Sequence, residues 1–273
     1  MNHCEKLLKQ ANELRITTLE MISHAKSGHP GGSLSCMDIL TALYFGGILK
    51  HDPKNPNDEN RDYFILSKGH ASAALYAVLA ERGYFPKKDL LTFREINSHL
   101  QGHPTPHTPG VEVAAGSLGQ GLSFSVGIAL AMRQDKKPNH IFTLLGDGEL
   151  QEGQVWEAAM AAGHFGLGNL TVIVDRNGLQ IDGKTDDVMR VAPVGEKFAA
   201  FGFEVKEIDG HNLTEILAAL NEAKLSKAKP VAIIAHTVKG KGAPCAENNF
   251  AYHGVALNPQ ELKEAEAHLR ATC

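Results

Sequence analysis

The hydrophobic positions near the start of the chain follow a helical period. Apolar residues recur at steps of three and four between Leu7 and Ala25. This spacing predicts an amphipathic helix that ends near Gly28 and Pro30. A second helix is predicted to begin at a cap on Ser35 and to run to about Gly46, before a loop rich in Asp, Pro and Asn.

Further along, short apolar runs alternate with helical patterns. The runs expected to form buried strands are Tyr63–Leu66, Ile141–Leu145, Leu170–Val174, Phe203–Ile208 and Val231–Ala235. The helices expected between them are Ala71–Arg82, Leu118–Gln134, Gln154–Phe165, Val194–Phe201 and Leu213–Lys224. This alternation is typical of a parallel sheet, and continuous apolar runs indicate strands that are covered on both faces. We therefore expect one α/β domain over residues 1–273, with a doubly wound, mainly parallel sheet and helices on both faces.

The stretch from residue 98 to residue 121 breaks this pattern because it is dense in glycine and proline. A loop of this length in a compact domain is usually functional or disordered. It carries His99, His103 and His107, whose spacing of four would suggest metal binding if they lay on a helix. The prolines between them exclude a helix, so a three-histidine metal site is not expected.

Charge and cysteine usage narrow the class of protein. With 27 Lys+Arg against 31 Asp+Glu, the net charge of −4 offers no basic excess for a nucleic acid. No apolar stretch approaches the roughly 20 residues of a membrane-spanning helix, and the first residues lack the apolar core of a secretion signal. The cysteines, at positions 4, 36, 245 and 273, are scattered, which favours reduced thiols. We expect a cytoplasmic protein with neither a nucleic acid nor a membrane as partner.

The most informative segment follows the predicted strand Ile141–Leu145. It reads Gly146-Asp147-Gly148 and leads into a helix. Ligands of open parallel sheets bind beyond the carboxyl ends of strands, glycines allow close backbone approach, and a helix N-terminus suits a phosphate group. The carboxylate of Asp147 would repel that phosphate unless a hard divalent cation bridges the two.

A second oxygen donor follows the next predicted strand, Leu170–Val174. Asn177 lies just beyond it, and one helix and one strand separate it from Asp147. If the two strands are neighbours, a right-handed crossover brings both side chains to one edge, where they could bind Mg²⁺ with a nearby backbone carbonyl. The alternative is a dinucleotide-binding turn, but the third glycine of that motif falls two positions late, at Gly153.

Together with motifs elsewhere, this turn resembles the thiamine diphosphate signature, and the chain resembles the N-terminal, diphosphate-binding half of transketolase. The motifs occur in the family's order: Ser27-Gly28-His29-Pro30-Gly31, Leu66-Ser67-Lys68-Gly69-His70, Gly102-His103-Pro104, Thr108-Pro109-Gly110-Val111-Glu112, Gly116-Ser117-Leu118-Gly119-Gln120-Gly121, Gly146-Asp147-Gly148 with Leu150-Gln151-Glu152-Gly153, Asp175-x-Asn177, Ile181-Asp182-Gly183, and Lys239-Gly240-Lys241-Gly242 before His253-Gly254. The chain departs from some members at Phe250, near which they carry an additional histidine.

The resemblance implies a role for each matching residue. The metal, Mg²⁺ with Ca²⁺ or Mn²⁺ as possible substitutes, would be bound by Asp147, Asn177 and the carbonyl of Leu179. The cofactor would contact Gly116, Ser117, Leu118, Gly148, Asn177, His70, Lys239 and His253, with Lys241 as a basic neighbour. The substrate channel would be faced by His29, His103 and His253, with His70 at the reaction centre. Glu152 would lie at a dimer interface and couple two active sites, whereas His164 and His211 match no family site and are expected to be structural.

The activity implied is transfer of a two-carbon ketol unit from a ketose phosphate to an aldose phosphate. A glutamate that contacts the cofactor's aminopyrimidine, and arginines for the sugar phosphate, belong to a second domain of the family. The resemblance therefore implies an N-terminal subunit that needs a separate C-terminal, pyrimidine-binding subunit, in a heterotetramer. Two alternatives remain: a subunit of another thiamine diphosphate enzyme, of the 2-oxo acid dehydrogenase or deoxyxylulose-phosphate synthase type, and a non-catalytic cofactor-binding protein.

Overall fold

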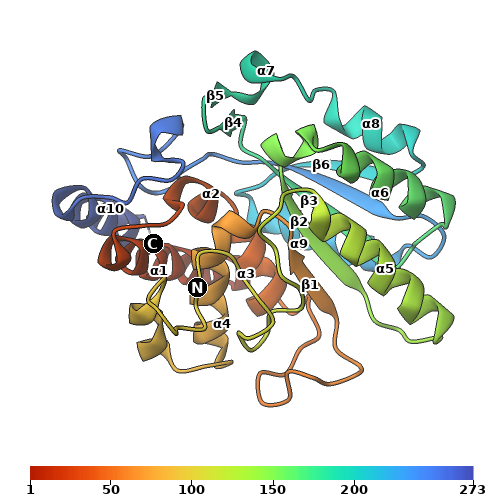
Figure 1. The fold of residues 1–273 in the computed structure, drawn as a ribbon, viewed down its shortest axis with the longest axis horizontal. Helices are drawn as coiled ribbons and strands as arrows, with labels where there is room; N and C mark the ends of the chain where they lie inside the picture. The colour runs from red at the N-terminus through yellow and green to blue at the C-terminus, as the bar shows by residue number, and fades with distance from the viewer. Residues whose placement is uncertain (273) are drawn as a thin grey trace.

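Five parallel strands form the central sheet of the computed structural model, which describes residues 1–272 (Figure 1). Their order is β1-β2-β3-β7-β6. The strands are β1 (Tyr63–Leu66), β2 (Ile141–Gly146), β3 (Leu170–Arg176), β6 (Glu204–Asp209) and β7 (Val231–His236). All five predicted strands are confirmed, with bounds that differ by no more than two residues. Cys273 lies outside the described residues.

Helices cover both faces of this sheet, which confirms the predicted α/β class. The helices are α1 (His3–Ala25), α2 (Pro30–Ser35), α3 (Met37–Phe45), α4 (Ser72–Arg82), α5 (Gln120–Gln134), α6 (Gly153–His164), α7 (Thr185–Val188), α8 (Val194–Ala200), α9 (Leu213–Leu225) and α10 (Pro259–Ala271). Helices α5, α6 and α8 lie on one side of the sheet, and α1, α3, α4 and α9 lie on the other (Figure 1).

Alternating side chains of the strands build the two halves of the core. Phe142 and Leu144 of β2 pack with helices α1, α3, α4 and α9, whereas Leu145 packs with α5, α6 and α8. The apolar run of β2 is buried from end to end because successive side chains point to opposite, equally covered faces. The polar groups that follow the strand are therefore held on a rigid frame.

One departure from the sequence prediction concerns Ser35. The helix expected to begin there is α3, which begins at Met37 with Cys36 at the cap position and no side-chain cap, whereas Ser35 is the last residue of α2. Ser35 does not cap the helix because its hydroxyl donates instead to Asp175 Oδ2, at 2.6 Å. A long-range partner thus replaces the local one.

Another departure is the C-terminal helix α10, which the hydrophobic pattern did not predict. Its start carries a clear signal: Asn258 and Glu261 form a reciprocal capping box, and Pro259 occupies the first turn. The helix packs through Ala265 and Leu269 with residues of α1. It places the two ends of the described chain close together (Figure 1).

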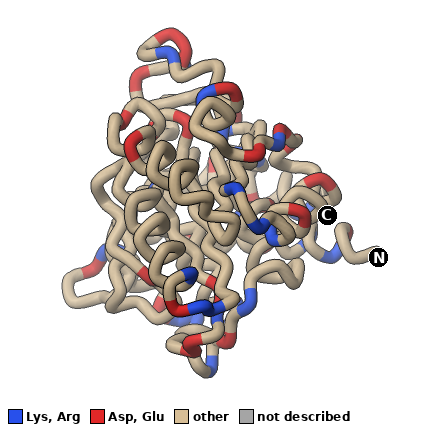
Figure 2. The backbone as a smooth tube through the Cα atoms, turned by 90° about the vertical axis from the view of Figure 1, so that its right-hand side faces the viewer, with Lys and Arg blue, Asp and Glu red and all other residues tan. Residues whose placement is uncertain are grey.

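Charged residues are distributed over the outer helices and loops. Figure 2 shows acidic and basic positions interspersed along the chain on the side in view. Among residues 1–272, no helix is both long and apolar enough to cross a membrane. A small antiparallel hairpin, β4 (Leu179–Gln180) and β5 (Gly183–Lys184), projects beyond the carboxyl ends of the main strands.

Candidate active site

A cavity of about 370 Å³ lies at the carboxyl ends of β1, β2, β3 and β7. The side chains and backbone that line it come from segments far apart in the sequence: His29, Lys68, His70, His103, Gly116, Leu118, Gly146, Asp147, Gly148, Glu149, Gln151, Glu152, Asn177, Leu179, Gln180, Ile181, Asp182, Lys239 and His253. The residues predicted to bind the metal, the cofactor or the substrate all line this cavity except Ser117, which is exposed and does not contribute to its wall.

One wall is built by the turns that follow β2 and β3. These strands are neighbours, with Gly146 opposite Asp175 in the register, as the predicted crossover requires. The Asp147 carboxylate accepts a hydrogen bond from Gly148 N at 2.9 Å through one oxygen and from Gly178 N at 2.7 Å through the other. The turn after β3 is therefore folded directly over Asp147.

This arrangement gathers oxygen donors of the kind that Mg²⁺ prefers. The Asn177 amide oxygen accepts from Leu179 N at 3.2 Å, and the Leu179 carbonyl accepts from Lys239 Nζ at 3.3 Å. Burial and the neighbouring Asp175 carboxylate raise the pKa of Asp147 to about 6. A buried carboxylate whose charge is disfavoured in this way fits a site that is completed by a cation.

Four histidines from four separate motifs meet at the cavity. The ring centroid of His29 lies 5.4 Å from that of His70, 5.4 Å from that of His253 and 6.3 Å from that of His103. His70 and His253 stack at 5.3 Å. The structure thus brings together the four histidines that the sequence placed in different segments.

All four imidazoles favour the neutral form. Burial and the Arg94 guanidinium lower the pKa of His29 to about 4, and the same two causes lower the pKa of His103. Burial and Lys239 lower the pKa of His253 to about 3, while burial and Lys68 lower the pKa of His70 well below its usual value. Near neutral pH each ring therefore offers one N–H donor and one nitrogen acceptor.

Lys239 is the cation at the centre of this group. Its side chain is 2% exposed, and Nζ lies 3.0 Å from His253 Nδ1 as well as near the Leu179 carbonyl. Burial and the charge of Lys68 lower its pKa to about 8. A buried ammonium with so few oxygen partners is well suited to receive an anion such as a diphosphate.

A buried ion pair that the sequence analysis missed supports this wall. Lys68, at the end of β1, donates to the Asp175 carboxylate, and Nζ also donates to Gly32 O at 2.7 Å. Although burial opposes both charges, Lys68 keeps the pKa of Asp175 below its usual value. Both residues lie at strand ends inside motifs that resemble the family, and this position could have identified them as residues of the site.

Glu149 is a second residue that the sequence analysis missed. Its carboxylate accepts from the Ser67 hydroxyl, from Gly119 N at 2.9 Å and from Gly146 N at 3.0 Å. Despite these donors, burial raises its pKa above the usual value. Glu149 therefore links the ends of β1 and β2 to the start of α5.

The loop that carries Gly116 approaches the end of β1 closely. A Cβ atom on Gly69 would lie 1.7 Å from the Ala115 carbonyl oxygen, so only glycine allows this contact.

The three histidines of the long loop lie in three different places. His103 reaches the cavity, His99 lies 3.5 Å from Asp89, and His107 lines a separate hollow on the surface.

Comparison with known proteins agrees with this geometry. The family model described as "Transketolase, thiamine diphosphate binding domain" matches residues 7–271. The chain belongs to the transketolase family. Within that family it corresponds to the thiamine diphosphate-binding domain, which confirms the resemblance and the predicted cofactor.

The relatives include proteins of similar length. The 6-deoxy-6-sulfo-D-fructose transketolase subunit SqwG of Clostridium sp. (strain MSTE9) is 46% identical over 264 residues, which cover 96% of each chain. One of the apulose-4-phosphate transketolase subunits of Phocaeicola vulgatus is 40% identical, over 96% of this chain and 92% of that protein. These relatives confirm the predicted class, a subunit of a transketolase, which is a transferase.

The solved structures that it resembles are longer. The crystal structure of transketolase from Campylobacter jejuni superposes with a TM-score of 0.93 at 40% sequence identity, and the match covers 99% of this chain but 43% of that one. The chain therefore spans less than half the length of that transketolase. The relatives named as subunits imply that a transketolase can be divided between partner chains.

Proposed function

We propose that residues 1–273 form a single domain that binds the diphosphate and metal of thiamine diphosphate. With a separate C-terminal subunit, it would transfer a two-carbon ketol unit from a ketose phosphate to an aldose phosphate. The observation that carries the proposal is the meeting of four neutral histidines, Lys239 and the Asp147 turn around one cavity. Neutral imidazoles suit a polyhydroxylated substrate because each can donate and accept a hydrogen bond.

Mg²⁺ is the metal that the oxygen donors fit, with Ca²⁺ or Mn²⁺ as possible substitutes. Asp147 and Asn177 would bind it through their side chains and Leu179 through its carbonyl, and each lines the cavity. The donors are all hard oxygens, and they leave room for phosphate oxygens to complete the coordination. Gly148 lies at the start of a short helical turn and lines the cavity, where its backbone would contact the diphosphate.

When bound, thiamine diphosphate supplies the carbanion chemistry that breaks and forms the C–C bond. The chain's own residues would position the cofactor and the substrate and would donate protons to the substrate. Because the Lys239 ammonium can only donate, His253 accepts through Nδ1 and carries its proton on Nε2. His29 and His103 would bind substrate hydroxyls, and His70 would lie at the reaction centre between the diphosphate and the other rings.

The partner would be a C-terminal, pyrimidine-binding subunit in a heterotetramer with two copies of each chain. Glu152 supports this assembly because it lies exposed at the rim of the cavity. The thiamine between the two subunits would be lined by Gly116, Ser117 and Leu118. Because Ser117 is exposed, it is free to contact a partner or the cofactor. The free thiols of Cys4, Cys36 and Cys245 suit a cytoplasmic location.

The decisive assay uses the chain with thiamine diphosphate, Mg²⁺, a ketose phosphate and an aldose phosphate, without and with the C-terminal subunit. We expect ketol transfer only when both subunits are present. Full turnover by the chain alone would overturn the need for a partner. Release of carbon dioxide from pyruvate would favour the 2-oxo acid type of enzyme, and cofactor binding without any turnover would favour a non-catalytic protein.

A further inference from the structure

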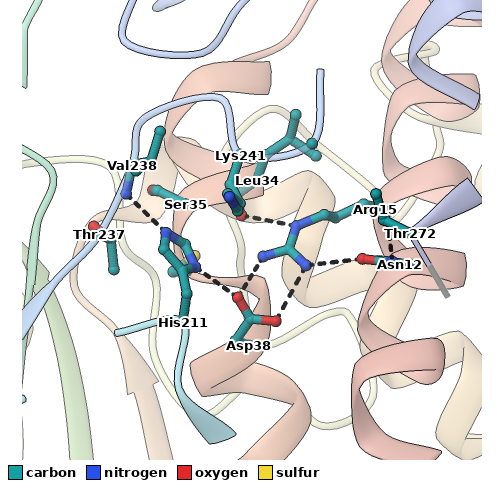
Figure 3. A network of polar contacts seen from close by, with 12 residues as sticks. Asn12, Arg15, Leu34, Ser35, Asp38, His211, Thr237, Val238, Lys241 and Thr272 are labelled. Carbon is teal, nitrogen blue, oxygen red and sulfur yellow. Dashed lines mark hydrogen bonds and ion pairs between the residues drawn. The ribbon is translucent and has the colours of Figure 1, made fainter. Parts of the chain in front are cut away.

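His211 connects two distant parts of the fold through both nitrogens of its ring. It lies in the turn between β6 and α9 (Figure 3). Nδ1 lies 2.7 Å from Asp38 Oδ2 of α3, and Nε2 lies 2.8 Å from Val238 N, just after β7. A backbone N–H can only donate, so Nε2 must accept and the ring proton must lie on Nδ1, directed at Asp38.

Asp38 is itself held in place by Arg15 of α1. The guanidinium contacts the two carboxylate oxygens at 3.1 and 2.6 Å, and both side chains are 2% exposed. Arg15 also donates to the Leu34 carbonyl at 3.3 Å. Although burial acts to raise it, Arg15 and the bond from His211 lower the pKa of Asp38 to about 2. The carboxylate therefore remains ionised and keeps the tautomer of His211 constant.

The other end of this network is the segment that carries Lys239. Three backbone N–H groups anchor this segment: Thr237 N donates to Arg176 O at 3.2 Å, Val238 N donates to His211, and Gly240 N donates to Gly31 O at 2.9 Å. Among these three bonds, the one at Val238 alone ends on a side chain. The bonds at Val238 and Gly240 flank Lys239, which lines the cavity, so His211 holds one of the two sides of this residue.

We propose that His211 is a positioning residue for the cofactor site. It fixes the backbone at Val238 and thereby places the Lys239 ammonium where the diphosphate is bound. This inference rests on the proposed function, because it takes Lys239 as a diphosphate ligand. His211 does not line the cavity, so it acts through the backbone and through Lys239.

Two substitutions separate hydrogen bonding from packing. In His211→Gln, the side-chain amide can donate to Asp38 and accept from Val238 N, as the imidazole does. In His211→Leu, the side chain fills similar space but can do neither. We measure the apparent Kd of thiamine diphosphate at saturating Mg²⁺, and kcat at saturating cofactor, on the chain assembled with its C-terminal subunit.

We expect His211→Leu to raise the apparent Kd about tenfold, with kcat within twofold of the wild type. His211→Gln should stay within about threefold in both. A tenfold change corresponds to about 1.4 kcal/mol, within the range for one lost hydrogen bond. Equal values of Kd for the Leu and Gln variants would overturn the proposal, because packing alone would then explain the effect of His211.

A double-mutant cycle with Lys239→Met tests the route through Lys239. We expect His211→Leu to have little further effect on Kd once Lys239 is replaced. An equal effect of His211→Leu in both backgrounds would contradict the inference but leave the proposed function intact. If Lys239→Met by itself left Kd unchanged, the proposed role of Lys239 would fail.

A third variant covers the case in which His211→Leu does not fold. The side chain of His211→Asn is too short to bridge Asp38 and Val238 together. The proposal then requires that the Asn variant raise Kd and that the Gln variant not do so, with both melting cooperatively. Equal Kd values for this pair would overturn it.

Discussion

The ammonium of Lys239 lies 3.0 Å from Nδ1 of His253, although the two residues come from opposite ends of a long loop. The contact joins the group best placed to bind an anion to a ring of the histidine cluster. It also orients that ring, because a charged donor at Nδ1 leaves the proton on Nε2. Binding of an anion to Lys239 should therefore affect the His253 ring.

Replacement of Lys239 should weaken cofactor binding. Lys239→Met removes a buried cation from the diphosphate end of the cavity, and a charge-assisted hydrogen bond contributes about 1.5–3 kcal/mol. We expect the Kd of thiamine diphosphate to rise at least tenfold in calorimetric titrations with Mg²⁺. Lys241→Met is the matched control, because Lys241 is 41% exposed and pairs with Glu247. Equal effects of the two substitutions would contradict a specific role for Lys239.

Replacement of Asp147 should uncouple the cofactor from the metal. In Asp147→Asn one oxygen and the negative charge are lost, so the cation loses a charged ligand and one of the two turn N–H groups loses its acceptor. For the wild type we expect chelation of Mg²⁺ by EDTA to raise the Kd of thiamine diphosphate strongly, and for Asp147→Asn we expect a weak Kd that EDTA hardly changes. Asp182→Asn, at the same cavity, is the control. Retention of the EDTA effect in Asp147→Asn would place the metal elsewhere.

Disruption of the Lys68–Asp175 pair should destabilise the fold. Lys68→Met leaves Asp175 buried and without its cation, which costs about 3–5 kcal/mol in the free energy of unfolding. The double variant Lys68→Met/Asp175→Asn should lose much less than the sum of its single variants in urea denaturation. Lys206→Met breaks a pair with Glu222 that is partly exposed, and its cost should stay below about 1 kcal/mol. Additive losses in the double variant would argue against coupling.

His140 should make the protein less stable in acid. Burial lowers its pKa to about 4 in the folded protein, whereas the unfolded chain has a value near 6.5. Between these values the unfolded state binds more protons, so the free energy of unfolding falls as pH falls. One such group contributes up to about 1.4 kcal/mol per pH unit. His140→Gln should therefore flatten the profile between pH 6.5 and 4, and the exposed His164→Gln should not.

Replacement of His103 should affect the substrate more than the cofactor. His103→Asn removes an imidazole from the cavity, and loss of one hydrogen bond of about 1 kcal/mol predicts a rise of about fivefold in KM for the ketose. His107→Asn, in the same loop but outside the cavity, is the matched control. A larger change in the Kd of thiamine diphosphate than in KM would place His103 against the cofactor instead.

The sequence alone determined the strands, the class of fold and most of the candidate site. Buried parallel strands read as continuous apolar runs, so β2 and β3 were located within two residues, and the turns after them identified Asp147 and Asn177. The histidines at positions 29, 70, 103 and 253 were found because each lies in a separate motif that resembles the family.

Only the tertiary structure decided which polar residues become partners. Ser35 has the local features of a helix cap but bonds to Asp175, and Lys68, Glu149 and His211 carry no local sign of their contacts. Hydrophobic periodicity reports the face that a residue presents within its own element. Hydrogen bonds and ion pairs between elements depend on crossovers that bring together positions far apart in the sequence, such as Lys68 and Asp175 at a separation of 107 residues, and no local pattern encodes that distance.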